Sequence, residues 1–472
     1  MKNPKRKKIV IIVLFMLTIT SFYYCDTNSC IRQGINFWEA LFSGKFFWYY
    51  SLNIASQQRG EMIDVANYDM ILNFLMGIWQ FPLYLLEKFF HINALDYFVF
   101  RIYGKLYLLI LIFFSADILK KIAGIIIREP KKEECIYFFY ISSACLFSAT
   151  GVIGQVDIIG IVFILLTYHS IVKEEKVKAL LFFIIACQCK NFSLFIFIPV
   201  IILLEKNLLK IAIYSILPLA AGWLINLPFK IVDAEATSLK AERVSAMLSE
   251  MTELKLRFMG IDIPVLFLVF IVICIVCYLI SVSKEDVLYY QWIFYVGFIS
   301  IVMVQLSFGT SPYWIIYLLP FISLFLFWKK VNIRWITMEM IASWFLIGGQ
   351  LIGFHWCYEY DVMFGMLIDH ILPLKKFELH GLTMLYSFLK RETLFSVWTI
   401  TYGVFVVWIL LFLVVNLPCF WEKIVNKEES MNEEKEIEQI FWVRLFGNYL
   451  LTNISVVFFI IFVLDAIVKK IL

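Results

Sequence analysis

The sequence predicts an all-α protein, a polytopic bundle of transmembrane helices in which residues 1–472 form one domain. Of its 472 residues, 62% are hydrophobic and 18% aromatic, whereas soluble domains contain roughly 45–50% apolar residues. Apolar runs of about 20 residues, the length that crosses a hydrocarbon core, recur along nearly the whole chain. The short alternating segments of a membrane β-barrel are absent from the sequence.

The first predicted span covers about 9–25 and follows a basic N-terminus, "MKNPKRKK". Its long apolar run and lack of a small-residue cleavage site indicate an uncleaved helix rather than a signal peptide. A long outer loop, about 26–96, follows with two amphipathic pieces, 35–50 and 70–90. The second piece is also compatible with dipping into the membrane or crossing it.

The region about 97–205 holds the next spans, at about 97–118, 135–153 and 158–171. The segment 179–207 then predicts two short helices hinged at Lys190 and Asn191, because neither apolar half is long enough to span alone. The C-terminal region, 206–472, predicts further helices at about 208–227, 261–281, 287–306, 312–328, 335–354, 394–417 and 448–468. Polar outer loops are expected at 228–260 and 355–393, and a solvated inner loop that is partly helical is expected at 422–439. The expected total is about 11–13 spans.

The basic residues predict the orientation and exclude some partners. Dense Lys and Arg in the short loops place these loops and the N-terminus in the cytoplasm, which fits a multi-pass protein of a bacterial plasma membrane, although Lys469 and Lys470 then lie outside. The net charge of +4 is spread between apolar runs, so no nucleic-acid partner is expected. The Cys and His spacings predict no structural metal.

Two places put polar side chains where an apolar helix would not need them. Asp26 follows the first span, where it is either an interfacial helix cap or a catalytic carboxylate at the membrane surface. Gln155 and Asp157 interrupt "SATGVIGQVDIIGIVFILL" (148–166). They form either a polar turn that caps the next helix or a pair that projects into a cavity of the bundle.

Three basic residues lie beside the same apolar runs. Lys190 sits at the predicted helix break and would suit a phosphate if it faces a cavity. Arg101 and Lys105 lie one helical turn apart near the outer end of their helix. Either could extend its charged end to the membrane surface, and together they could bind a lipid phosphate.

This arrangement resembles the GT-C superfamily of integral membrane glycosyltransferases. The resemblance rests on an acidic residue after the first helix, on a long first outer loop, and on G-Q-x-D opening a helix before a basic turn, a Lys and a Pro. It is firmest over about 97–205. The residues that carry it are Asp26, Gly154, Gln155, Asp157, Lys190 and Pro199, with "RIYGKLYLLILIFFSADILKKI" (101–122) and "SPYWIIYLLPFISL" (311–324).

The resemblance implies transfer of a sugar from a polyprenyl-phosphate donor to a glycan, lipid or protein acceptor on the extracytoplasmic face. Asp26 would be the general base, with Asp69 and Asp64 as alternatives, because the paired acidic residues of many members are missing here. Lys190, Arg101 or Lys105 would hold the donor phosphate, and Gln155 and Asp157 would line the cavity. No cofactor is implied, and a divalent metal is possible but not predicted.

Two other functions stay open on the sequence. A polysaccharide polymerase of the O-antigen type would favour a large late outer loop with Arg and His, and 355–393 contains Arg391, His355, His370 and His380. A transporter or lipid flippase would favour internal repeats and paired broken helices. Only one broken segment, around Lys190, is found.

Overall fold

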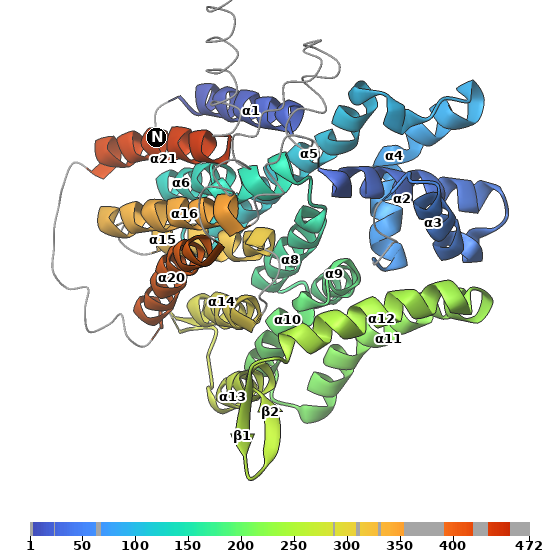
Figure 1. Cartoon of the computed structure of the whole chain (residues 1–472). Coiled ribbons are helices and arrows are strands. Elements are labelled where there is room, and N and C mark those ends of the chain that lie inside the picture. Colours follow the sequence, from blue (N-terminus) through green and yellow to red (C-terminus); the bar gives the residue numbers. More distant parts are fainter. Residues whose placement is uncertain are drawn as a thin grey trace, which may run out of the picture.

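The computed structural model of the chain describes residues 3–22, 24–62, 68–286, 288–307, 312–328, 332–353, 391–418 and 433–453. These residues are overwhelmingly helical (Figure 1), and one two-stranded antiparallel sheet is the extent of β-structure among them. The predicted all-α class is therefore confirmed for the described part of the chain.

The N-terminal half begins with two helices that meet at 91°. Asn3 caps the first by accepting a hydrogen bond from the Arg6 amide, and Pro4 opens it. The helices here are α1 (Pro4–Ser21), α2 (Cys25–Phe42), α3 (Tyr49–Gln58), α4 (Met70–Phe90), α5 (Phe98–Ile126), α6 (Pro130–Ile141), α7 (Ala144–Leu146), α8 (Asp157–Val172), α9 (Lys176–Cys189) and α10 (Phe192–Leu204). Short helical turns cover Phe46–Trp48, Ala94–Asp96 and, as a π-turn, Phe147–Val152.

The second half has one sheet between long helices. Its elements are α11 (Leu208–Val232), α12 (Ala234–Met251), β1 (Lys255–Phe258), β2 (Ile261–Pro264), α13 (Val265–Leu279), α14 (Tyr289–Ser307), the 3₁₀ turn η4 (Pro312–Leu318), α15 (Leu319–Trp328), α16 (Ile333–Gly353), α20 (Arg391–Val415) and α21 (Glu433–Thr452). The segment 228–260, expected as a loop, instead contains α12 and a β-strand. Its "ATSLKAERVSAMLSE" is rich in good helix formers, which explains the difference.

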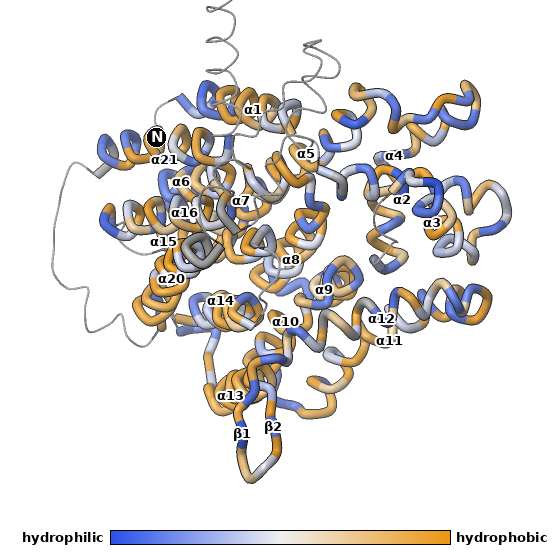
Figure 2. The backbone as a smooth tube through the Cα atoms, viewed as in Figure 1, coloured by the Kyte–Doolittle hydropathy of each residue, from blue (hydrophilic) through white to orange (hydrophobic). Residues whose placement is uncertain are grey.

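Several helices have the length and composition to cross a membrane. Among the described residues there are five, or up to six if the bent pair α1 and α2 is one span. Four further apolar helices have only 10–17 residues, which is short of the roughly 20 that a hydrocarbon core requires. Figure 2 shows the apolar character of α13 and α20 along their length. The expected span at 448–468 lies mostly outside the described residues.

Helix α21 closes the bundle against elements from the start and middle of the chain. Lys7 of α1 pairs with Glu438 at 2.6 Å, and Arg444 pairs with Glu339 of α16 at 2.7 Å. The Arg444 guanidinium also donates to the Phe139 carbonyl at the end of α6. Figure 1 shows α21 beside α1, α6 and α16.

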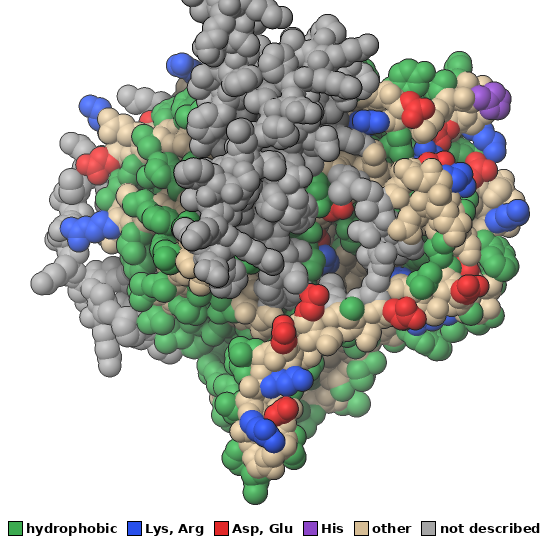
Figure 3. Space-filling model, viewed as in Figure 1, with side chains coloured by type: hydrophobic (Ala, Val, Ile, Leu, Met, Phe, Trp, Pro, Cys, Tyr) green, Lys and Arg blue, Asp and Glu red, His purple; other side chains and the backbone are tan. Residues whose placement is uncertain are grey.

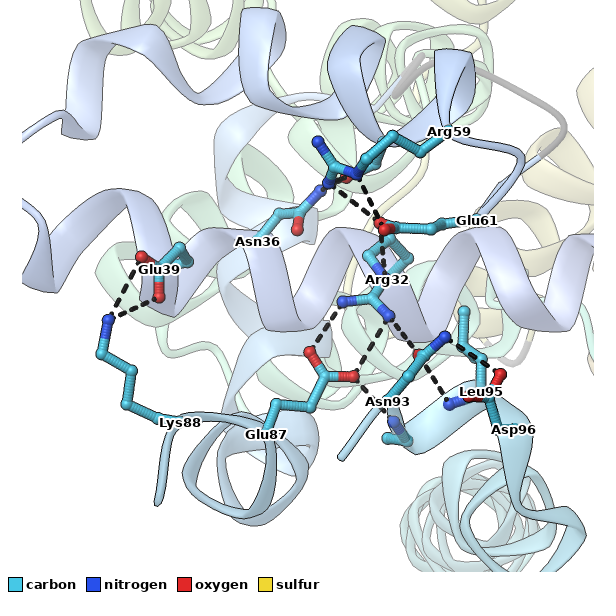
Figure 4. A network of polar contacts seen from close by, with 12 residues as sticks. Arg32, Asn36, Glu39, Arg59, Glu61, Glu87, Lys88, Asn93, Leu95 and Asp96 are labelled. Atoms are coloured by element: carbon cyan, nitrogen blue, oxygen red, sulfur yellow. Dashed lines mark hydrogen bonds and ion pairs between the residues drawn. The ribbon is translucent and has the colours of Figure 1, made fainter. Parts of the chain in front are cut away.

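An ionic network fixes α2, whose first turn carries Asp26. The Arg32 guanidinium makes two hydrogen bonds to Glu87 at the end of α4, at 2.7 and 3.1 Å, and a third to Asn93. Glu61 approaches the same guanidinium at 3.4 Å, and Arg59 donates to Glu61 (Figure 4). Buried, two-pronged Arg–carboxylate contacts of this kind hold geometry strongly, so α2 is anchored to the segment that follows it.

Candidate functional site

A cavity of about 230 Å³ lies where several chain segments with polar residues meet. The start of α2, residues 68–69, the turn before α8, the break between α9 and α10, the middle of α12 and the turn η4 all contribute to its wall. Its lining residues are Asp26, Ser29, Cys30, Gln33, Tyr68, Asp69, Gln155, Cys187, Gln188, Cys189, Lys190, Asn191, Phe192, Val244, Tyr313 and Trp314. Of the candidates from the sequence, Asp26, Asp69, Gln155 and Lys190 therefore share one cavity.

Gln155 holds the carboxylate of Asp26. Its side-chain amide donates to Asp26 Oδ2 at 2.8 Å, and its own backbone N–H donates to the Ala149 carbonyl of the π-turn. Gly154 makes the turn possible, because its φ of +77° disfavours any residue with a side chain. Asp26 lies in the first turn of α2, where the positive end of the helix dipole favours an ionised carboxylate.

Lys190 occupies the break between α9 and α10, where the sequence predicted a hinge. It has extended backbone angles and ends α9. The Ala186 carbonyl accepts hydrogen bonds from both the Lys190 backbone N–H and the Ser193 hydroxyl. The ammonium group lies 4.4 Å from the ring centroid of Trp314, a cation–π distance. The structure confirms the predicted hinge. The hinge places the Lys190 side chain at the cavity wall.

Asp157 lies behind Lys190 and is not part of the cavity wall. Its Oδ1 is 3.2 Å from Lys190 Nζ and accepts a hydrogen bond from the Tyr317 hydroxyl at 3.1 Å. Only 1% of its side chain is exposed, against 13% for Lys190. The carboxylate begins α8, so it caps the helix electrostatically and orients the lysine.

Asp69 is held by cationic and amide groups that the sequence did not single out. Lys240 of α12 pairs with its Oδ1 at 2.5 Å, and the Asn226 amide donates to the same oxygen at 3.1 Å. Lys240 also donates to the Tyr50 hydroxyl. Burial, followed by the nearby Asp69 carboxylate, raises the pKa of Tyr50 far above its ordinary value, so this phenol stays protonated and can donate.

A second cavity of about 430 Å³ continues from the first between α9, α11 and α12. Both cavities share part of their wall, including Asp69, Gln188 and Val244. Leu219, Trp223 and Leu248 add apolar side chains to the second cavity. A polar chamber therefore adjoins a more apolar one.

The two candidates on α5 lie elsewhere. Lys105 is fully buried, and its ammonium donates to the backbone carbonyls of Phe22, Gly151 and Val152 at 3.2, 2.6 and 3.3 Å. It thus ties the end of α1 to the π-turn. Arg101 donates to the Leu95 carbonyl at 2.5 Å and is absent from the cavity wall.

Aromatic side chains on the cavity wall were missed by the sequence analysis. Tyr68, Tyr313 and Trp314 line it, and burial, with added effects from Cys30, Asp157 and Asp26, raises the pKa of Tyr68 well above its ordinary value. The signal available in the sequence was the pair "YW" beside a polar turn. A protonated phenol and an indole face suit a ligand with hydroxyl groups and apolar faces.

Asp64 and almost all of the loop 355–393, with its three histidines, lie outside the described residues. Among the residues that the structure describes, no group of three or more His, Cys, Asp or Glu could hold a metal ion.

Comparisons with known protein families, with curated proteins and with solved structures found no match for this chain.

Proposed function

We propose that the protein is an integral membrane glycosyltransferase of the GT-C type, with about 11–13 spans, that uses a polyprenyl-phosphate sugar as donor. The observation that carries the proposal is the shared cavity. It joins Asp26, oriented by Gln155, with Lys190, oriented by Asp157, in a chain built of membrane helices. A base and a phosphate-binding cation in one chamber are what such a transfer needs.

In this proposal the acceptor hydroxyl attacks C1 of the donor sugar from the side opposite the phosphate. The bond between C1 and the phosphate oxygen breaks, and its electron pair leaves with the lipid phosphate. Asp26 takes the proton of the attacking hydroxyl, while Lys190 offsets the charge that develops on the leaving phosphate. Tyr68 and Trp314 would contact the sugar ring in the cavity wall.

The surroundings of the carboxylates favour Asp26 over Asp69 as the base. Asp69 is already neutralised by Lys240 and bonded to Asn226, so abstracting a proton there would break an ion pair. Asp26, in contrast, accepts a hydrogen bond from the neutral side-chain amide of Gln155 at 2.8 Å and lines the same cavity as Lys190. The apolar side chains of Leu219, Trp223 and Leu248 in the wall of the second cavity support a lipid-linked donor, whose chain needs apolar contacts.

We propose a bacterial plasma membrane, a cytoplasmic N-terminus and an extracytoplasmic cavity, with a glycan, lipid or protein as acceptor. The broken helix at Lys190 is also compatible with a transporter or flippase, and the test below distinguishes these functions.

The test is sugar transfer in proteoliposomes with a panel of labelled polyprenyl-phosphate sugars, in the presence and absence of a chelator. Asp26→Asn should abolish transfer while donor binding and expression are retained. Lys190→Met should weaken donor binding and slow transfer. The matched control is Asp262→Asn, which neutralises an exposed carboxylate on β2 and should leave transfer unchanged.

Full activity of Asp26→Asn with loss in Asp69→Asn would move the base to Asp69. Absence of transfer by the wild type with every donor, together with lipid scrambling or solute uptake, would overturn the enzyme proposal in favour of a transporter. Chain extension of lipid-linked repeat units would instead indicate a polymerase.

A further inference from the structure

The strand pair β1 and β2 forms a projecting ribbon with two chemically different faces. The register pairs Leu256 with Ile263 and Phe258 with Ile261. Side chains alternate between the two faces of a strand, so these four apolar residues share one face. Lys255, Arg257 and Asp262 occupy the other, with Arg257 opposite Asp262. Figure 3 shows charged side chains along the projecting ribbon and hydrophobic atoms at its tip.

The described part of the protein leaves most of the apolar face uncovered, with Ile263 half-buried. Leu256, Phe258 and Ile261 are 54%, 61% and 66% exposed, and Met259 at the tip is 87% exposed. A two-stranded hairpin is only marginally stable in water. An apolar face of this kind therefore requires a surface to bury it.

The turn itself puts an apolar side chain where a polar one would fit better. Met259 and Gly260 both have positive φ, +49° and +82°, as in a two-residue turn that matches strand twist. Asn, Asp or Gly adopts this conformation at the first position with less strain than Met does. Met259 therefore costs conformational energy and adds apolar surface at the tip.

The hairpin is continuous with α13, one of the apolar helices that are shorter than a full membrane span. Val265, the first residue of α13, donates its N–H to the Leu254 carbonyl at the base of the hairpin. No charged residue occurs between Asp262 and Lys284, and α13 exposes apolar side chains such as Ile271, Val272 and Ile275. Its 15 residues are about 22 Å long, so a hairpin attached to its N-terminal end lies near the membrane boundary rather than far out in water.

We propose that this hairpin embeds its apolar face and tip in the lipid bilayer at the interface beside α13, with Lys255 and Arg257 toward anionic headgroups. The interface is the depth that fits, because the open edges of a two-stranded sheet need water or headgroups as hydrogen-bond partners. At that depth the apolar face of the hairpin contacts acyl chains and the charged face contacts headgroups, where anionic lipid attracts cations. This inference is independent of the proposed enzymatic activity.

The test uses the full chain in vesicles of neutral phospholipid with or without phosphatidylglycerol. A fluorescent amino acid replaces Phe258, and the control probe replaces Glu285, which is exposed in a turn between helices. Lipids brominated near the top of the acyl chain should quench the probe at 258 several-fold more than the probe at 285. Aqueous iodide should show the opposite preference.

A second variant separates membrane contact from folding of the hairpin. Met259→Asn should relieve strain in the turn yet reduce lipid quenching of the probe at 258 several-fold. Arg257→Gln should weaken only the increase in lipid quenching that anionic lipid causes. Equal iodide quenching at both positions would overturn the proposal. Protection from iodide that grows with the protein-to-lipid ratio would also overturn it, because a second copy would then cover the hairpin.

Discussion

Lys105→Met tests whether Lys105 is a tie within the fold or a ligand group. The substitution keeps most of the side-chain length but removes an ammonium that donates to three backbone carbonyls, at 2.6 to 3.3 Å. Hydrogen bonds from a charged group contribute about 1.5–3 kcal/mol each. Their loss is partly offset because a buried ammonium costs several kcal/mol of desolvation. We expect a net destabilisation of about 2–4 kcal/mol, since the carbonyls of Phe22, Gly151 and Val152 lose a donor.

The free energy of unfolding can be measured by reversible SDS titration of the purified protein. Lys88→Met is the matched control, because Lys88 pairs with Glu39 at an exposed site and should contribute no more than about 1 kcal/mol. A Lys105→Met protein as stable as the wild type would refute the reasoning. If that protein also showed a raised KM for the donor, Lys105 would be a phosphate ligand, as the sequence first suggested.

Two further predictions concern the bundle and the site. Arg444→Met should destabilise the protein by about 3–5 kcal/mol, because it leaves the buried Glu339 carboxylate without its cation. Adding Glu339→Gln should recover part of that loss in a double-mutant cycle. Strictly additive effects of the two substitutions would contradict the pairing. Gly154→Ala should cost about 1–2 kcal/mol from its positive φ alone, and its new Cβ would lie 2.5 Å from Thr27 Oγ1. We therefore expect this variant to displace Gln155 and to lose transfer activity, while Gly403→Ala, where no heavy atom lies near the added Cβ, should not.

The positions of helices were largely predictable from hydrophobic pattern. The break at Lys190 and Asn191 followed from two apolar runs too short to span alone, and the structure places it there. Local signals also sufficed for the turn at Gly154 and Gln155. These features depend on neighbouring residues, which the sequence presents directly.

The partners of these residues were not predictable, because they depend on long-range packing. Asp69 and Lys240 are 171 positions apart, and nothing local to either indicates the other. The residues around Asp157 left open whether it caps α8 or lines the cavity, and the family resemblance implied the cavity. In the structure it begins α8 and lies behind Lys190. The sequence identified polar groups that are costly to bury, but it did not indicate which of these groups neutralise one another.

The contacts of α21 have a consequence for how the chain reaches its final state in the membrane. Lys7 and Glu438 are separated by 431 positions, and Asn453 bonds Thr18 across 435. Helix α1 is synthesised long before the carboxylate that neutralises its buried lysine. Contacts between such distant residues form slowly because a long loop must close. Bundle closure is therefore a late step of biogenesis, and a ribosome-stalled chain ending before α21 should be a substrate for quality-control proteases.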